Sequence, residues 1–287
     1  MQAKKEEKSA EQMTRREIIR LRVNETAGAP TEMDAQVVTD LVANERPVNI
    51  EVNGQSVAVL MALPGEEEEL AAGFALGERL IGRKEDLLLL RACEPEAPPD
   101  RQGDASQWPV RVKIVISAAN APEKPLPVMV RYACGAVGEA AFAPLERQLP
   151  LGFTVAVGAL RGLLGKFTAR QTVFRATGCT HAAALFDSAG ELLALKEDIG
   201  RHNAIDRVLG WALLNDVSLS DKLLVTTGRA SADLAFKALS AGVPILASLS
   251  APTALAVEWA RRGGLTLIGF LRPRKINIYA WPERIAR

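Results

Sequence analysis

Residues 223–270 read LLVTTGRASADLAFKALSAGVPILASLSAPTALAVEWARRGGLTLIGF. Short apolar runs at 223–227, 244–248 and 265–270 predict strands, and apolar residues at helical spacing over 232–239 and 253–262 predict the helices between them. Strands and helices that alternate in this order form a parallel sheet through right-handed crossovers. The sequence therefore predicts an α/β fold.

The loops after these strands are the place to look for a ligand, because ligands of open α/β sheets bind beyond the carboxyl ends of the strands. These loops read TGRAS at 227–231, LSAP at 249–252 and LRPRK at 271–275. Small residues permit close backbone approach, and guanidinium groups bind oxyanions. Each loop alone would be an ordinary turn, but three at one edge predict a phosphorylated ligand. The chain has no G-x-G-x-x-G motif and no complete P-loop, which argues against an ordinary NAD or ATP site.

A fourth polar segment, EDIGRHNAID at 197–206, follows a predicted strand and opens a predicted helix. The first N–H groups of a helix lack intrahelical partners and favour anions. Arg201 and His202 beside them predict a phosphate receptor. The alternative is a solvated cap in which Asp198 accepts hydrogen bonds from the free amides, and the residues leave both interpretations open.

The N-terminal half predicts a separate α+β part. Apolar runs at 47–52 and 56–61 flank Asn53-Gly54, a strong hairpin signal, and an acidic turn opens a helix predicted from residue 66 towards residue 82. We expect a disordered charged tail at 1–20, the α+β part with the Cys134 loop at 21–157, and an α/β ligand-binding domain at 158–287.

The composition is that of an ordinary globular protein. The chain has 287 residues, 48% hydrophobic and 24% charged, with a net charge of +1. Such a balance argues against nucleic acid or an anionic membrane as a partner. The first twenty residues lack the apolar core of a secretory signal, and no apolar run approaches the ~20 residues that a bilayer requires. We therefore expect a cytoplasmic protein.

Three cysteines are an odd count without the spacing of a disulfide framework. Cys134, in the segment RYACGAVG, is either a reactive thiol or a small buried hydrophobe. Cys93 follows an apolar run and is expected in the core. Cys179 lies two residues before His181, but Ala183 stands where a zinc deaminase needs its glutamate, and four ligands are lacking. We predict no metal site.

Five segments together carry a family resemblance: CGAVG at 134–138, TGCTH at 177–181, DIGRHNAID at 198–206, TGRAS at 227–231 and FLRPRK at 270–275. They resemble the formate dehydrogenase accessory sulfurtransferase family (FdhD), and the resemblance spans roughly residues 21–285. It implies a cytidine-deaminase-like α/β fold without zinc: a three-layer domain with a mixed sheet, plus a smaller N-terminal α+β part.

The same resemblance implies an activity. Members take sulfur from a cysteine desulfurase as a cysteine persulfide. They pass it to the molybdenum of the bis(molybdopterin guanine dinucleotide) cofactor before that cofactor enters formate dehydrogenase. The implied partners are the formate dehydrogenase catalytic subunit, a cysteine desulfurase and, in a homodimer, a second copy of the chain.

The resemblance also implies site residues. Cys134 would carry the persulfide, and GDP would serve as an analogue of the bound cofactor. Residues expected to bind the cofactor are Gly178, His181, Arg201, His202, Asn203, Arg229, Ser231, Ser250, Phe270, Leu271, Arg272, Pro273, Arg274 and Lys275.

Two positions depart from the family pattern. Val137 replaces a second thiol, and Cys179 stands where the family usually has glycine. A lone Cys134 can carry a persulfide, but it cannot release the sulfur by forming a disulfide with residue 137. The alternative function is therefore a chaperone that binds and delivers the molybdenum cofactor without transferring sulfur.

Overall fold

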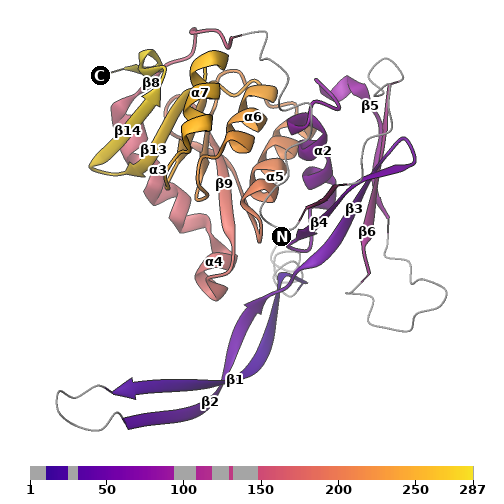
Figure 1. Ribbon diagram of the computed structural model, residues 1–287, viewed down its shortest axis with the longest axis vertical. Helices are drawn as coiled ribbons and strands as arrows, with labels where there is room; N and C mark the ends of the chain where they lie inside the picture. The colour runs from indigo at the N-terminus through magenta and orange to yellow at the C-terminus, as the bar shows by residue number, and fades with distance from the viewer. Residues whose placement is uncertain (1–10, 25–31, 94–107, 118–128, 132–147, 287) are drawn as a thin grey trace.

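The computed structural model describes residues 11–24, 32–93, 108–117, 129–131 and 148–286. Its larger sheet has six strands in the order β10–β9–β11–β12–β13–β14 (Figure 1). They are β9 (His181–Phe186), β10 (Leu192–Asp198), β11 (Leu223–Thr226), β12 (Ile245–Ser248), β13 (Thr266–Arg272) and β14 (Lys275–Ala280). β11, β12 and β13 are parallel, as predicted, whereas β9, β10 and β14 pair antiparallel. The predicted α/β class with a mixed sheet is confirmed.

Helices cover both faces of this sheet. α3 (Val157–Arg170) buries Leu160, Leu163 and Phe167 against one face. α5 (Arg201–Leu214), α6 (Ala232–Ser240) and α7 (Ala254–Gly263) bury their apolar residues against the other. Strand β9 shows the division, because Ala182 and Ala184 belong to the first cluster whereas Ala183 and Leu185 belong to the second. Such alternation is what a strand buried on both faces requires.

Residues 271–275 are not the loop that the sequence predicted. β13 continues to Arg272, and Pro273-Arg274 forms a tight hairpin to β14, whose Lys275 pairs with Arg272. The register shifts between Gly269 and Arg272, so that Phe270 and Leu271 together oppose one residue of β14. This β-bulge turns Phe270 outward and Leu271 inward. The sequence analysis did not predict β14. Its alternating apolar and polar residues follow the last strand of the βαβαβ pattern, from which the other strands of this region were predicted.

The smaller sheet belongs to the N-terminal half and has the order β5–β6–β3–β4–β7. Its strands are β3 (Arg46–Val52), β4 (Gln55–Ala62), β5 (Leu87–Cys93), β6 (Val110–Ile116) and β7 (Met129–Arg131). Asn53 and Gly54 adopt positive φ angles of 50° and 81°, as a tight hairpin turn demands, which confirms the predicted hairpin. The helix expected from residue 66 is α2 (Glu67–Gly77) and ends before Arg79, whose φ is 59°. Short segments complete the chain: α4 (Thr172–Thr177), β8 (Val155–Ala156), β15 (Ile285–Ala286), η1 (Lys84–Asp86) and η5 (Pro282–Arg284).

α2 lies between the two sheets and crosses α5 at two glycines (Figure 1). A Cβ atom on Gly73 would lie 1.7 Å from the carbonyl oxygen of Asp206, and one on Gly210 would lie 1.8 Å from that of Glu69. The two helix backbones are therefore in contact at this point. One hydrophobic cluster contains residues of both sheets and of both helices, so the two halves share a core.

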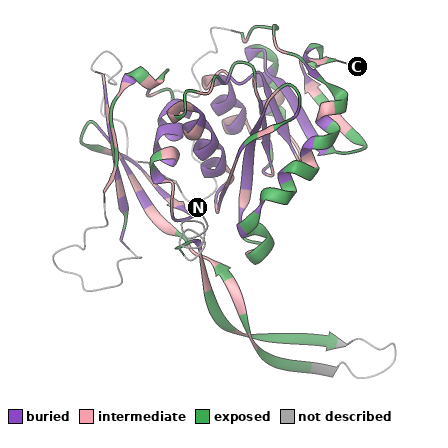
Figure 2. Cartoon of the chain, turned by 180° about the vertical axis from the view of Figure 1, so that it is seen from behind, coloured by how far each residue is buried: buried purple, intermediate pink, exposed green. Residues whose placement is uncertain are grey.

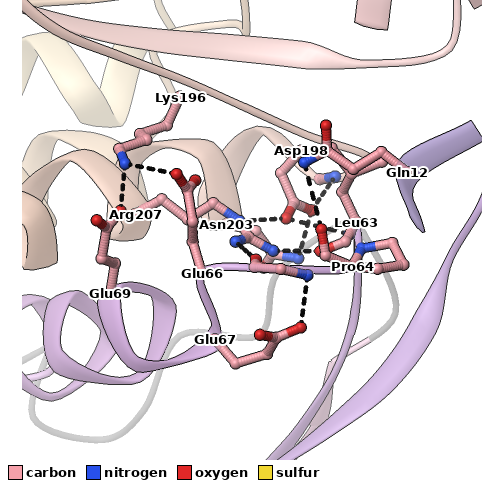
Figure 3. A network of polar contacts seen from close by, with 12 residues as sticks. Gln12, Leu63, Pro64, Glu66, Glu67, Glu69, Lys196, Asp198, Asn203 and Arg207 are labelled. Carbon is pink, nitrogen blue, oxygen red and sulfur yellow. Dashed lines mark hydrogen bonds and ion pairs between the residues drawn. The ribbon is translucent and has the colours of Figure 1, made fainter. Parts of the chain in front are cut away.

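A buried ion pair fixes the same junction (Figure 3). Arg207 Nε donates to Asp198 Oδ2 over 2.7 Å, and the two side chains are 1% and 0% exposed. The Arg207 guanidinium also donates to the carbonyl oxygens of Leu63 and Gly65, in the loop between β4 and α2. Asp198 accepts in return from the backbone N–H of Leu63.

The first two strands form an arm that projects from the body (Figures 1 and 2). β1 (Met13–Asn24) pairs antiparallel with β2 (Glu32–Ala43) over 12 residue pairs. Residues 13–20, expected in a disordered tail, thus form strand, because apolar residues alternate along both segments and meet across the ribbon. Ile19 and Val37 oppose each other and are 71% and 72% exposed. No helix among the described residues is long and apolar enough to cross a bilayer.

The helix crossing yields a stability prediction. Gly210→Ala should lower the free energy of unfolding by about 3 kcal/mol or more, because the methyl group would overlap the backbone of α2 and force the helices apart. Denaturant unfolding followed by circular dichroism measures the change. Gly162→Ala on α3 is the matched control, since nothing lies within 4 Å of its Cβ position. Equal stability of the two variants would contradict the packing described.

Candidate functional site

One edge of the six-stranded sheet collects most of the predicted site residues. The parallel strands β11 and β12 end there, and β9 begins there because it runs antiparallel to β11. β10 ends at the same edge, since Asp198 pairs with His181. The segments that follow β10, β11 and β12 therefore meet, as the sequence analysis expected of residues 197–206, 227–231 and 249–252.

Buried hydroxyl groups hold the turn after β11 in place. The N–H of Gly228 donates to Thr226 Oγ1 over 3.1 Å, and its carbonyl oxygen accepts from Ser248 Oγ over 2.6 Å. Ser248 Oγ also accepts from the N–H of Ser250 over 2.8 Å. Thr226 and Ser248 are 0% exposed, so buried side chains at the ends of β11 and β12 hold the backbone of these turns.

The start of α5 has no side-chain cap. Gly200 is its N-cap residue, and the first turn carries no carboxylate. Asp198 accepts from the N–H of Gly200 over 3.1 Å, but it is completely buried on Arg207. Asp198 thus accepts from one amide of this turn, as the alternative of a cap expected, but this contact is buried and not solvated.

Arg201 is the first residue of α5, and its side chain lies against Gly228 of the neighbouring turn. Its Nε atom is buried without a hydrogen-bond acceptor among the residues that the structure describes. A buried guanidinium N–H without an acceptor is costly. Arg201 also forms no ion pair with a carboxylate among the described residues, so its charge is not neutralised there.

His202 and Asn203 lie beneath the edge rather than on it. His202 is 5% exposed, and its Nε2 pairs with the carboxylate of Asp233 in the first turn of α6. Burial acts to raise the pKa of Asp233, but the hydrogen bond and charge of His202 outweigh it and hold this pKa well below its usual range. The Asn203 amide donates to the carbonyl oxygen of Met61 and to Asp198. Both predicted ligands thus make internal contacts that fix the start of α5.

His181 is half-buried at the start of β9, and its Nδ1 lies 3.1 Å from Thr227 Oγ1. Burial lowers the pKa of His181, and the neighbouring charges of Arg201 and His202 lower it further. The imidazole of His181 is therefore neutral at neutral pH. It adds a hydrogen-bonding group to the edge without adding a charge.

Exposed cations border this edge. Four basic side chains are exposed here: Arg229, Arg272, Arg274 and Lys275. None of them forms an ion pair with a carboxylate in the described parts of the chain. Arg272 Nη1 donates to the carbonyl oxygens of Leu249 and Leu271 over 2.8 Å each, which ties the hairpin to the loop after β12. Phe270 is 38% exposed and has a φ of 51°. Ser231 and Ser250 are half-buried, Leu271 is buried and Pro273 is exposed.

Two of the three cysteines lie among the described residues. Cys134, the predicted persulfide carrier, lies outside the described residues. Cys93 is half-buried at the end of β5, rather than fully in the core as expected. Cys179 is exposed and follows Gly178, which ends α4 with a φ of 70°.

Comparisons with known proteins show the family of this chain. Residues 43–286 match the model of the FdhD/NarQ family. The chain belongs to the FdhD/NarQ family. It is 41% identical to the sulfur carrier protein FdhD of Nocardia farcinica, over 86% of this chain and 88% of that one. It is 38% identical to the sulfur carrier protein FdhD of Streptomyces coelicolor, over 95% of both chains. A crystal structure of "a putative formate dehydrogenase accessory protein" from Desulfotalea psychrophila superposes with a TM-score of 0.67 at 27% identity, covering 94% of this chain and 99% of that one.

Sequence reasoning placed Thr227 and Gly228 in a ligand loop without their contacts, and it missed Asp233. Thr227 contacts His181, Gly228 contacts Arg201, and Asp233 pairs with His202. Asp233 had a usable signal, because it lies in the first turn of a predicted helix, where it neutralises the positive end of that helix. The partners of Thr227 and Gly228 could not be predicted, since they come from elements far away in sequence.

The environment of His181 yields a titration prediction. Its pKa in the folded protein should lie below the ordinary value of about 6.5, and Arg201→Gln should raise it by removing a neighbouring positive charge. Proton NMR resolves this, because the chain has only two histidines. As the pH falls through about 6.5, the unfolded chain binds this proton before the folded one does, so the contribution of His181 to stability declines. A pKa of His181 that Arg201→Gln leaves unchanged would contradict the arrangement.

Proposed function

We propose that this protein is a sulfur carrier for the maturation of a formate dehydrogenase. In this proposal Cys134 takes sulfur from a cysteine desulfurase as a persulfide and delivers it to the molybdenum bis(molybdopterin guanine dinucleotide) cofactor, which is bound as cargo at the sheet edge. The relatives named sulfur carrier protein FdhD support the carrier role. The name of the Desulfotalea structure supports a formate dehydrogenase as the client. We expect the protein to act in the cytoplasm as a homodimer.

The observation that carries the binding site is the contrast between three helix starts. α6 has its own carboxylate, Asp233, and α7 is capped by the side chain of Thr253, which accepts from the N–H of Ala256. Only α5, among these three, begins without a side-chain cap or an acidic first turn, and it places Arg201 there. The free amides and the guanidinium together suit a phosphate group. Two guanine dinucleotides carry two pyrophosphates, which the exposed cations around the edge would also attract.

The last described residue before the thiol segment lies in a strand beside a contact of α5. β7 ends at Arg131, which pairs with Leu60 of β4. The next residue of β4, Met61, accepts the hydrogen bond from Asn203 at the start of α5. Cys134 itself lies outside the described residues, so its action at this site is part of the proposal.

The loading step requires only thiol chemistry. The Cys134 thiolate attacks the terminal sulfur of the desulfurase persulfide, a new S–S bond forms on Cys134, and the desulfurase leaves as a thiolate, with no net oxidation. Release of that sulfur as sulfide needs two electrons, which a second thiol supplies by forming a disulfide. Val137 stands where the family motif has this thiol. This substitution favours the alternative function, a chaperone that delivers the cofactor without transferring sulfur.

The binding site is tested with GDP as the cofactor analogue. Arg201→Ala should weaken GDP binding roughly tenfold or more in calorimetry, because it removes a charged hydrogen bond to phosphate. Arg261→Ala is the matched control, since Arg261 is exposed near the C-terminal end of α7, away from the ligand edge. Equal GDP affinity of the Arg201 and Arg261 variants would refute the assignment.

The thiol chemistry separates the two functions. Desulfurase and cysteine should form a cyanide-labile sulfane on the protein, and Cys134→Ser should abolish both this sulfane and activation of the client dehydrogenase, whereas Cys179→Ser should preserve both. Val137→Cys should increase sulfur transfer if release is limiting. Full client activation by Cys134→Ser, with no sulfane on the wild type, would establish the chaperone instead.

A further inference from the structure

The strongest unexplained contact at the edge lies between Arg201 and Gly228. A Cβ atom on Gly228 would lie 2.7 Å from Cβ of Arg201, 2.8 Å from its Cδ and 3.2 Å from its Cγ. The aliphatic part of the arginine therefore crosses the turn where a side chain would otherwise stand. The φ of Gly228 is not in the left-handed region, so backbone conformation does not require glycine here.

Neither side of this contact can move away easily. Thr226 and Ser248, both fully buried, hold the N–H and the carbonyl oxygen of Gly228. On the other side, the backbone at the start of α5 is fixed through Gly200, which donates to Asp198, and through the buried amide of Asn203. A methyl group on residue 228 would overlap Cβ of Arg201, which the backbone fixes, so the start of α5 or the turn would have to shift and carry the arginine out of place.

We propose that Gly228 is a positioning residue for anion binding: the absence of its side chain lets Arg201 lie across the β11–α6 turn with its guanidinium at the edge. The inference rests on the proposed function, in which Arg201 binds phosphate. The Nε–H of Arg201 is buried and has no acceptor in the described structure, so the inference concerns the terminal N–H groups of the guanidinium. The contact with Gly228 fixes the side chain by packing, so that the N–H groups remain free for a ligand oxygen.

The arginine lies close to other ionisable groups of the edge. Its charge lowers the pKa values of both His181 and Asp233, which come from β9 and α6. The charge of Arg201 therefore acts on groups of β9 and of α6 as well as on the start of α5.

A double-mutant cycle on GDP affinity tests the proposal. Gly228→Ala should weaken GDP binding roughly tenfold or more, as loss of the charged hydrogen bond does. In an Arg201→Gly background, the same substitution should change GDP affinity by less than about twofold, because the group that Gly228 positions is gone. Gly162→Ala controls for the general effect of replacing glycine, since its Cβ position is open.

The outcomes are distinguishable. If Gly228→Ala weakens GDP binding equally in both backgrounds, glycine acts on the edge itself and not through Arg201, and the proposal is wrong. Wild-type affinity in Gly228→Ala would also overturn it. If Gly228→Ala fails to fold, the pair Gly228→Ala and Arg201→Gly should restore folding, and failure to do so would refute the contact. Wild-type protein that binds no GDP would refute the proposed function, and this role of Gly228 with it.

Discussion

The ion pair between Asp198 and Arg207 is the interaction on which the remainder of the molecule depends. Asp198 ends β10 of the larger sheet, and Arg207 belongs to the second turn of α5. Both also bond to the backbone of residues 63–65, which follow the smaller sheet. A buried charge that loses its partner costs about 3–5 kcal/mol. The pair therefore fixes the two sheets and the start of α5 in one arrangement, and the edge where β10, β11 and β12 end is a consequence of that arrangement.

The distribution of charge follows from the same constraint. The carboxylates near the edge are turned inward, Asp198 onto Arg207 and Asp233 onto His202. The arginines and the lysine of the hairpin and of the turn after β11 face outward. A small net charge of +1 for the whole chain is thus compatible with a locally positive surface. The net charge of the whole chain does not predict the charge at this edge, because the local charge depends on which ionisable side chains the fold buries.

The sequence predicted those features that depend on neighbours along the chain. The βαβαβ pattern and the Asn53-Gly54 turn are local, and both appear as expected. The arm was missed because its charged residues resemble a tail until the opposite strand is known. His202 and Asn203 were predicted at the right place, but their burial depends on Asp233 and on Met61, which is 142 residues away. Long-range contacts of this kind have no signature in a single sequence. The meeting of these segments at one edge was therefore predictable, whereas the division between buried and exposed residues there was not.

β2 contacts α4, but no residue of the arm belongs to the hydrophobic clusters of the body, so we expect the arm to open independently. A two-stranded ribbon is marginally stable in water by itself, and beyond its base the apolar side chains of Ile19, Leu21 and Val37 are open to solvent. Opening the arm breaks no contact in the core that joins the two sheets. Its amide protons should therefore exchange with solvent through local fluctuations, whereas those of β11 and β12 should exchange only through global unfolding. A single melting temperature consequently describes the two sheets but not the arm.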